Sequence, residues 1–276
     1  MMETASVKSA DPGIVKIVQL TDLHIFNDPK GSLLGVVTAD SFQAVLNEVS
    51  ALRGEKEPDL LLVTGDISQD YSEGSYRRFA SMIRQVGKPM FWLPGNHDDG
   101  PLMYRIFPGL GLSIARQIFC NNWQIVMLNA QVYSSPCGYL PPDQFEFLTQ
   151  CLDSHRDMNA LICIHHNTFR VNSAWLDQHY LKNADEFTGM LHHYPNVRCV
   201  LCGHVHQETD EVHDHIRYIS SPATSIQFLP DSDSFGLDTA EPGWRELILH
   251  RDGSFETAVH RLHSGLYVPD YASSGY

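Results

Sequence analysis

The sequence has no apolar run of about 18 residues that could cross a bilayer, and its start has no apolar core typical of a signal peptide. Residues 1–13 predict a disordered N-terminal tail. No internal repeat or low-complexity segment occurs either. We therefore expect a cytoplasmic protein that does not engage a membrane.

Basic residues are scarce, with 19 Lys and Arg against 33 Asp and Glu and a formal net charge of −14. This balance disfavours binding of duplex nucleic acid, which needs many phosphate contacts. Cysteine is limited to six residues, and Cys199-x-x-Cys202 has no second such pair with which to form a zinc knuckle. The cysteines are therefore interpreted as reduced packing residues. Histidine, by contrast, is abundant at 15 residues, as in many metal enzymes, although histidines also accumulate on surfaces.

Short apolar runs alternate with amphipathic ones along the first three quarters of the chain. Strands are predicted at 14–20, 59–65, 89–95, 160–166 and 197–203, helices at 38–52, 72–86, 141–154 and 184–193, and a hairpin at 116–130. From residue 208 onward the pattern predicts antiparallel strands in a second sheet: a hairpin at 208–220, then strands at 244–250 and 254–262. This order predicts an α/β (α+β) fold in which two sheets pack face to face with helices outside. We expect one domain over 14–276, with an irregular insertion at 167–183.

Potential metal ligands follow five of these strands. In chain order they are Asp22 and His24, then Asp66, then Asn96 with His97 and Asp98, then His165 and His166, and finally His204 and His206. In open α/β sheets such groups converge at the carboxyl ends of the strands. Taken singly, each segment has a plainer interpretation, since Asp and Asn favour caps and turns and a His-x-His pair is often an exposed loop. Their repetition at five strand ends predicts a metal site.

The blocks Asp22-Leu23-His24, Gly65-Asp66, Gly95-Asn96-His97-Asp98, His165 and Gly203-His204-Val205-His206 resemble the motifs of the calcineurin-like metallophosphoesterases. The segments LLGVVTADSFQAVL, SAWLDQHYLKNA, LCGHVHQE and PGWRELILH are similar to those of one branch, the bacterial class III 3′,5′-cyclic-AMP phosphodiesterases. The resemblance implies a four-layer αββα sandwich of two mixed sheets flanked by helices. One departure is Asn167-Thr168, where many relatives have two prolines, and it predicts a more relaxed loop over the site.

The resemblance also implies two divalent or trivalent metal ions per chain, for which iron, manganese or zinc would suit the mixed ligands. One ion would be held by Asp22, His24, Asp66 and His206, and the other by Asp66, Asn96, His165 and His204, with Asp66 bridging. His97 would face the leaving oxygen as proton donor or transition-state stabiliser, and Asp98 would orient it. The substrate would contact His24, Asn96, His97, His206 and Trp175.

Other polar residues have less definite roles. Strand alternation turns His166 away from His165, which favours a structural or supporting role. His213 and His215 are expected at an exposed hairpin tip, and His192 and His193 at a solvated helix end. Trp175, Asp177, His179 and Asn183 in the insertion could shape a nucleotide pocket or simply pack within their loop.

The activity that the resemblance implies is hydrolysis of 3′,5′-cyclic AMP to 5′-AMP by a metal-bound hydroxide, so that the partner is a small cyclic nucleotide. The same ligands serve phosphomonoesterases, nucleases and glycerophosphodiesterases. A broad-specificity metallophosphodiesterase is therefore the alternative, and a non-catalytic scaffold is a third hypothesis that the complete ligand set disfavours. The sequence does not show the oligomeric state, and a homodimer is one option.

Overall fold

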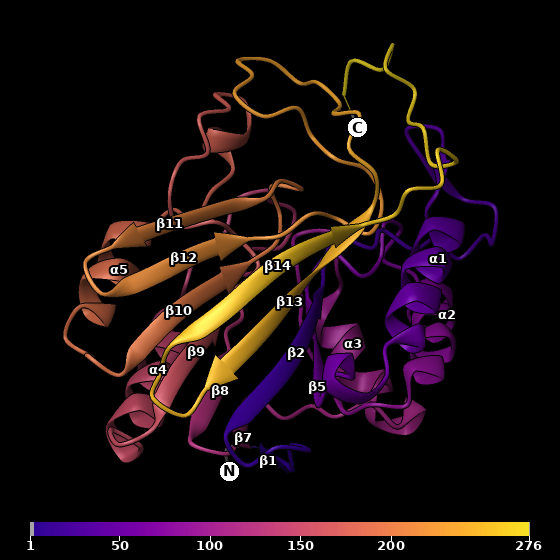
Figure 1. Ribbon diagram of the computed structural model, residues 1–276. Coiled ribbons are helices and arrows are strands. Elements are labelled where there is room, and N and C mark those ends of the chain that lie inside the picture. Colours follow the sequence, from indigo (N-terminus) through magenta and orange to yellow (C-terminus); the bar gives the residue numbers. More distant parts are fainter. Residues whose placement is uncertain (1–2, 276) are drawn as a thin grey trace.

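The computed structural model describes residues 3–275, which form two mixed β-sheets packed face to face with helices on both outer sides (Figure 1). The five-stranded sheet has the order β14-β13-β2-β5-β6, and the seven-stranded sheet has the order β1-β7-β8-β9-β10-β12-β11. The strands of the first are β2 (Ile14–Leu20), β5 (Leu60–Thr64), β6 (Met90–Leu93), β13 (Gly243–His250) and β14 (Phe255–Arg261). Those of the second are β1 (Thr4–Val7), β7 (Gln117–Cys120), β8 (Trp123–Met127), β9 (Asn159–Cys163), β10 (Val197–Cys202), β11 (Thr209–His213) and β12 (Ile216–Ser220).

Within residues 3–275, five α-helices cover the sandwich. The outer face of the five-stranded sheet packs against α1 (Thr38–Ala51), α2 (Glu73–Ile83) and α3 (Gly100–Ile106), and that of the other sheet against α4 (Pro142–Ser154) and α5 (Ala184–Leu191). Alternating strand residues serve both sides, since Val15 and Ile17 of β2 lie between the sheets while Val18 and Leu20 face the helices. The predicted αββα sandwich is therefore confirmed.

The C-terminal strands do not form a sheet of their own, so that prediction is wrong. The β11–β12 hairpin extends the seven-stranded sheet through β12 beside β10, whereas the β13–β14 hairpin extends the five-stranded sheet through β13 beside β2 (Figure 1). The pattern of a hairpin indicates which residues are buried. It does not indicate which distant strand provides the pairing edge, because that partner is non-local.

The prediction of a disordered tail over residues 1–13 is also wrong for the residues that the structure describes. Residues 4–7 form β1, which pairs in parallel with β7, and Ala5 and Val7 pack against the core between the sheets. The amide of Ala10 donates to the Asp59 carboxylate at 2.8 Å. The edge of β7 and the Asp59 side chain lie far away in sequence, so a local pattern could not reveal them. Residues 1, 2 and 276 lie outside the described part.

Short elements in the loops were not predicted. β3 (Ser32–Leu33) and β4 (Val36–Val37) form a small hairpin before α1, and α3 begins just after Asp98. The insertion 167–183 is irregular, as expected, apart from one 3₁₀ turn at Leu176–Gln178.

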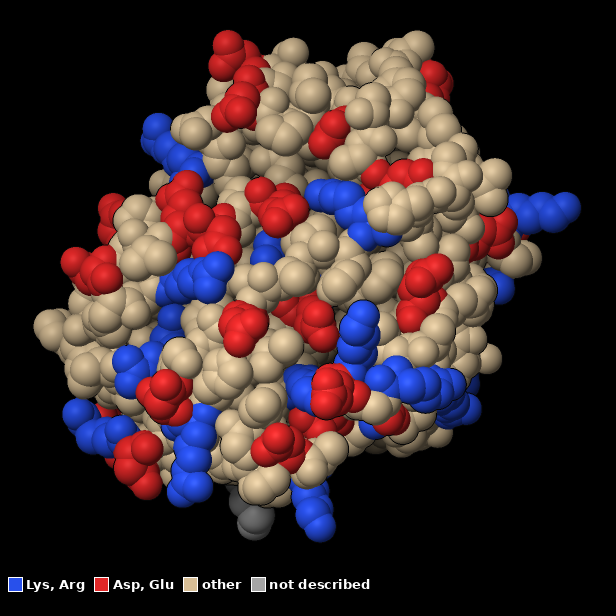
Figure 2. Space-filling model, viewed as in Figure 1, with Lys and Arg blue, Asp and Glu red and all other residues tan. Residues whose placement is uncertain are grey.

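The surface agrees with the composition. Figure 2 shows acidic and basic side chains interspersed over the face that carries β13 and β14, with no broad basic stripe on that face. Within residues 3–275, none of the helices combines the length and apolarity needed to span a membrane.

Candidate metal centre

The predicted ligands meet at one edge of the sandwich, where strands of both sheets end. Two groups of buried side chains have ligand atoms within 4.8 Å of one another. Asp22, His24 and His206 make the first group, and Asp66, His165 and His204 make the second. Each group takes residues after β2 or β5 of one sheet and after β9 or β10 of the other. The centre therefore exists only when the two sheets are packed together.

Asp66 lies between the two groups. Its Oδ2 is 3.4 Å from His165 Nε2 in its own group and 3.8 Å from His24 Nε2 in the other. The first group closes through His206 Nε2, which is 3.2 Å from His24 Nε2. Asn96 joins the second group, with its Oδ1 3.2 Å from His165 Nε2. Asp66 Oδ2 thus lies within 4 Å of an imidazole in each group, and the sharing of Asp66 between two sites of four ligands stays a prediction.

The backbone of the ligand segments is strained. Asp22, His24, Asp66, His204 and His206 have φ values of 53°, 51°, 49°, 70° and 49°, in the left-handed region that non-glycine residues rarely adopt. Each such residue costs of order 1–3 kcal/mol, and such residues concentrate at functional sites. Sequence motifs do not reveal this strain.

Glycines precede three of the ligand segments because the strand ends approach closely. A methyl group on Gly203 would overlap Thr21 Oγ1, one on Gly95 would overlap the Asp66 carboxylate, and one on Gly65 would overlap the His165 ring. The Gly-Asp, Gly-Asn-His and Gly-His motifs are thus explained by the lack of space beside the ligands.

Three ligand imidazoles are oriented through their second nitrogen. His24 Nδ1 lies 2.5 Å from Gln69 Oε1, His165 Nδ1 lies 2.8 Å from the Thr64 carbonyl, and His206 Nδ1 lies 2.8 Å from the Ile226 carbonyl. Each acceptor favours a proton on Nδ1 and leaves the Nε2 lone pair facing the centre. Sequence reasoning missed Gln69, because a glutamine three residues beyond Asp66 carries no signal by itself.

The donor set fits metal ions. Buried His204 Nε2 has no hydrogen-bond partner within the described residues, an arrangement that is costly without a ligand. Burial lowers the pKa of His24 and of His204 to about 3, so both rings are neutral and able to coordinate. Burial alone would raise the pKa of Asp66, but neighbouring His165 and His97 outweigh it and hold that pKa well below its usual range. Two buried clusters, with the Asp66 carboxylate close to both, indicate a centre for two metal ions.

His97 stands beside this centre, half-buried. Its backbone amide donates to Asp66 Oδ1 at 2.8 Å, and its ring centroid is 5.1 Å from that of His24.

Asp98 has a structural function that the sequence did not suggest. Its buried carboxylate accepts the backbone amides of Ile67, Ser68 and Gly95 and the hydroxyl of Tyr76, at 2.9–3.2 Å. Asp98 thereby ties the loop after β5 to the loop after β6. Burial and Asp66 raise its pKa to about 7. Orientation of the His97 ring by Asp98 stays a prediction.

A pocket with a volume of about 240 Å³ opens next to the second group of ligands. Asn96, His97 and His204 line it where it meets the centre, and we call its other lining residues the wall: Pro136, Trp175, Leu176, His179, Phe235 and Gly275. Trp175 packs edge-on against Phe228 and Phe235, at centroid distances of 4.9 and 5.2 Å. Of the four candidates in the insertion, Trp175 and His179 line this pocket. Asp177 instead accepts the Val171 amide and Asn183 binds the backbone of Leu140, so these two shape the loops.

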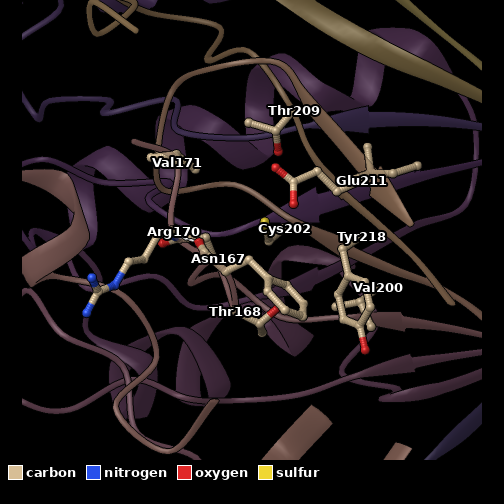
Figure 3. A pocket seen from close by; sticks show the side chains of 11 residues that line it. Asn167, Thr168, Arg170, Val171, Val200, Cys202, Thr209, Glu211 and Tyr218 are labelled. Carbon is tan, nitrogen blue, oxygen red and sulfur yellow. Dashed lines mark hydrogen bonds between the residues drawn. The ribbon is translucent and has the colours of Figure 1, made fainter. Parts of the chain in front are cut away.

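The loop at Asn167-Thr168 is not relaxed, contrary to expectation. Both residues are buried, the Asn167 amide group donates to the Phe169 carbonyl at 2.7 Å, and the Leu181 amide donates to the Asn167 carbonyl at 3.1 Å. Figure 3 shows the small cavity that these residues line together with side chains of β10 and of the β11–β12 hairpin. Hydrogen bonds to and from Asn167 therefore constrain this loop.

The remaining histidines lie outside both ligand groups. His166 is fully buried with its ring centroid 4.6 Å from that of His204. His192, His193 and His215 are exposed, as predicted. His213 is only partly exposed, because its ring stacks on Phe169 at 3.9 Å.

Comparison with known proteins adds three findings. A family model described as calcineurin-like phosphoesterase matches residues 15–208. The 3′,5′-cyclic adenosine monophosphate phosphodiesterase CpdA of Vibrio vulnificus is 45% identical over 276 residues, covering 100% of both chains, and that of Escherichia coli K12 is 42% identical over 263 residues, covering 95% of both. The crystal structure of a dimetal phosphatase from Danio rerio has a TM-score of 0.60 at 14% identity, covering 90% of this chain and 99% of its own, which shows a shared fold.

Proposed function

Because this chain belongs to the calcineurin-like phosphoesterase family, we propose that it hydrolyses 3′,5′-cyclic AMP to 5′-AMP and so lowers a second messenger. The observation that carries the proposal is the pair of buried ligand clusters, with the Asp66 carboxylate within 4 Å of an imidazole in each, beside a pocket of about 240 Å³. Relatives that align with 95–100% of the chain and are named for cyclic AMP support the choice of substrate.

In this proposal, Asp22, His24, Asp66 and His206 hold one metal ion, and Asp66, Asn96, His165 and His204 hold the other. When bound, two such ions supply charge that polarises the phosphoryl oxygens and acidifies a water. The two carboxylates contribute two negative charges against at least four positive ones, so the centre attracts an anion although the protein as a whole is acidic. Iron, manganese and zinc all suit these ligands.

His97 is the group that we assign to the leaving oxygen. Its backbone amide is bonded to Asp66, and this half-buried residue lines the pocket, so its ring can reach a phosphodiester held at the centre. There it would protonate the departing 3′ oxygen. His24, Asn96 and His206 surround the phosphate position and would contact it as well.

The aromatic wall of the pocket suits the nucleoside. Bases stack on aromatic side chains whatever their identity, and Trp175 lies within a cluster with Phe228 and Phe235. The buried Nε1 of Trp175 has no hydrogen-bond partner within residues 3–275, which leaves a donor beside the pocket.

A second function, that of a broad-specificity metallophosphodiesterase, is favoured by one feature of the same pocket. Outside the metal centre, most of its lining is apolar or aromatic, with His179 as its one ionisable wall residue among those described. Such a lining discriminates weakly among organic groups.

Kinetics on three substrates distinguishes these functions. The protein, reconstituted in turn with iron, manganese and zinc, should show its highest kcat/KM on cyclic AMP, compared with bis(4-nitrophenyl) phosphate and 4-nitrophenyl phosphate. Equal values on both diesters would support the broad-specificity enzyme. Elemental analysis that finds no stoichiometric metal would contradict both functions.

We also propose a cytoplasmic location. All six cysteines are free thiols, and Cys163, Cys199 and Cys202 are buried with raised pKa values, which burial causes. Unpaired thiols in this number are typical of reducing compartments.

A further inference from the structure

Tyr71 has an unusual backbone for a bulky residue. Its φ is 56°, and it is the one Tyr, Phe or Trp with a left-handed φ among residues 3–275. Its side chain is 47% exposed, so burial does not explain the conformation. The turn is held by the preceding residue, since the Asp70 carboxylate accepts the Asn27 amide at 2.7 Å, the Ser72 hydroxyl at 2.6 Å and the Ser68 hydroxyl at 3.3 Å.

The ring of Tyr71 is presented to His97. The two rings lie within 22° of parallel, with centroids 6.5 Å apart. The His97 ring also meets that of His24, with centroids 5.1 Å apart and an angle of 72°, and the His97 backbone amide donates to Asp66. The neighbouring rings of Tyr71 and His24 restrict how the His97 ring can rotate.

We propose that Tyr71 is a positioning residue, whose ring, held by a strained turn, keeps the His97 imidazole directed at the leaving oxygen. The inference rests on the proposed function in one respect, the assignment of His97 to the leaving group. It explains why a solvent-exposed tyrosine is kept in a costly conformation next to the centre. Pre-oriented groups contribute to rate, because the ring need not be ordered during the reaction.

Tyr71→Gly separates this role from a purely structural one. Glycine adopts φ 56° without strain, so the midpoint of thermal unfolding should stay or rise, and metal content should not change. Turnover of cyclic AMP should nevertheless fall by roughly 3–10-fold, the effect expected from loss of one ring contact. KM should stay nearly constant, whereas a tyrosine that bound the nucleotide would raise KM. Tyr71→Phe keeps the ring and should restore kcat.

Asp214→Gly is the matched control. Asp214 has φ 55° at the tip of the β11–β12 hairpin, outside both ligand groups, so the substitution gives the same backbone relief without touching His97. Its kcat should equal that of the unsubstituted protein.

A second substrate tests the link to the leaving group. Bis(4-nitrophenyl) phosphate releases a nitrophenolate that needs little protonation, so Tyr71→Gly should hardly change its kcat. For Tyr71→Gly, equal losses of kcat on both substrates, or an unchanged kcat on cyclic AMP, would overturn the inference.

The His97→Ala variant, measured in parallel, should lose roughly 10²–10⁴-fold in kcat on cyclic AMP and far less on the aryl diester. If His97→Ala loses kcat equally on both substrates, the role proposed for His97 is wrong and the inference falls with it. If His97→Ala loses more on cyclic AMP but Tyr71→Gly loses equally on both substrates, the proposed function stands and the inference alone fails.

Discussion

Replacing Gln69 with alanine should weaken one metal site and spare the other. Gln69 Oε1 is 2.5 Å from His24 Nδ1, and this contact fixes the imidazole tautomer that directs Nε2 at Asp66 and His206. Without this contact the His24 ring can rotate, or it can carry its proton on Nε2 instead of Nδ1. His165 keeps its Thr64 carbonyl, so the second group should be little affected.

The expected magnitude follows from how such supporting contacts behave. Removing the partner of a ligand histidine typically costs about 10–100-fold in metal affinity, or about 1.4–2.7 kcal/mol. Metal titration of the stripped protein by calorimetry should show one of two binding steps weakened by this factor. Gln69→Glu retains an acceptor and should restore binding. Gln43→Ala is a control, because Gln43 on α1 bonds only exposed Asn47 and Gln85 in the described hydrogen-bond network.

Two unchanged binding steps in Gln69→Ala would refute the idea that this side chain orients His24. Equal weakening of both steps would show that the two ligand groups do not act as separable sites.

Three further predictions concern the centre and its surroundings. Asp66→Ala should abolish both metal binding and hydrolysis, because the Asp66 carboxylate lies close to an imidazole of each cluster; two bound ions with normal turnover would contradict this. His213→Ala should leave the metal content unchanged by elemental analysis, since the His213 ring stacks on Phe169; loss of an ion would mean that His213 and His215, and not His204 and His206, bind metal. Gly65→Ala, at φ 99° and against the His165 ring, should lower the free energy of unfolding in urea by about 1–3 kcal/mol, and unchanged stability would argue against a tight approach.

Much of the centre was predictable because its ligands lie in short sequence motifs. Each strand that precedes a ligand is a short apolar run, and each run is followed by a small motif such as Gly65-Asp66 or Gly203-His204. Strands with this burial and length form parallel sheets, whose carboxyl ends gather side chains. The structure brings all seven predicted ligands together, counting Asn96 through its contact with His165.

Errors arose where a segment depends on a distant partner. β1 folds because β7 offers a free edge, and the two C-terminal hairpins join different sheets because β10 and β2 each offer one. The alternation of hydrophobic residues in a hairpin is the same whichever of the two sheets the hairpin joins. The aromatic cluster around Trp175 was only partly anticipated, since Phe228 and Phe235 come from a loop after β12 that has no clear pattern.

The sequence by itself determined which atoms are available for chemistry and at which strand ends they lie, because residue type and local periodicity are properties of a short stretch. Only the tertiary structure decided that each metal group combines both sheets, that Gln69 and the carbonyls of Thr64 and Ile226 orient the imidazoles, and that Tyr71 faces His97. These features depend on contacts between segments far apart in the chain and on backbone strain that packing stabilises, and neither is expressed in any local pattern.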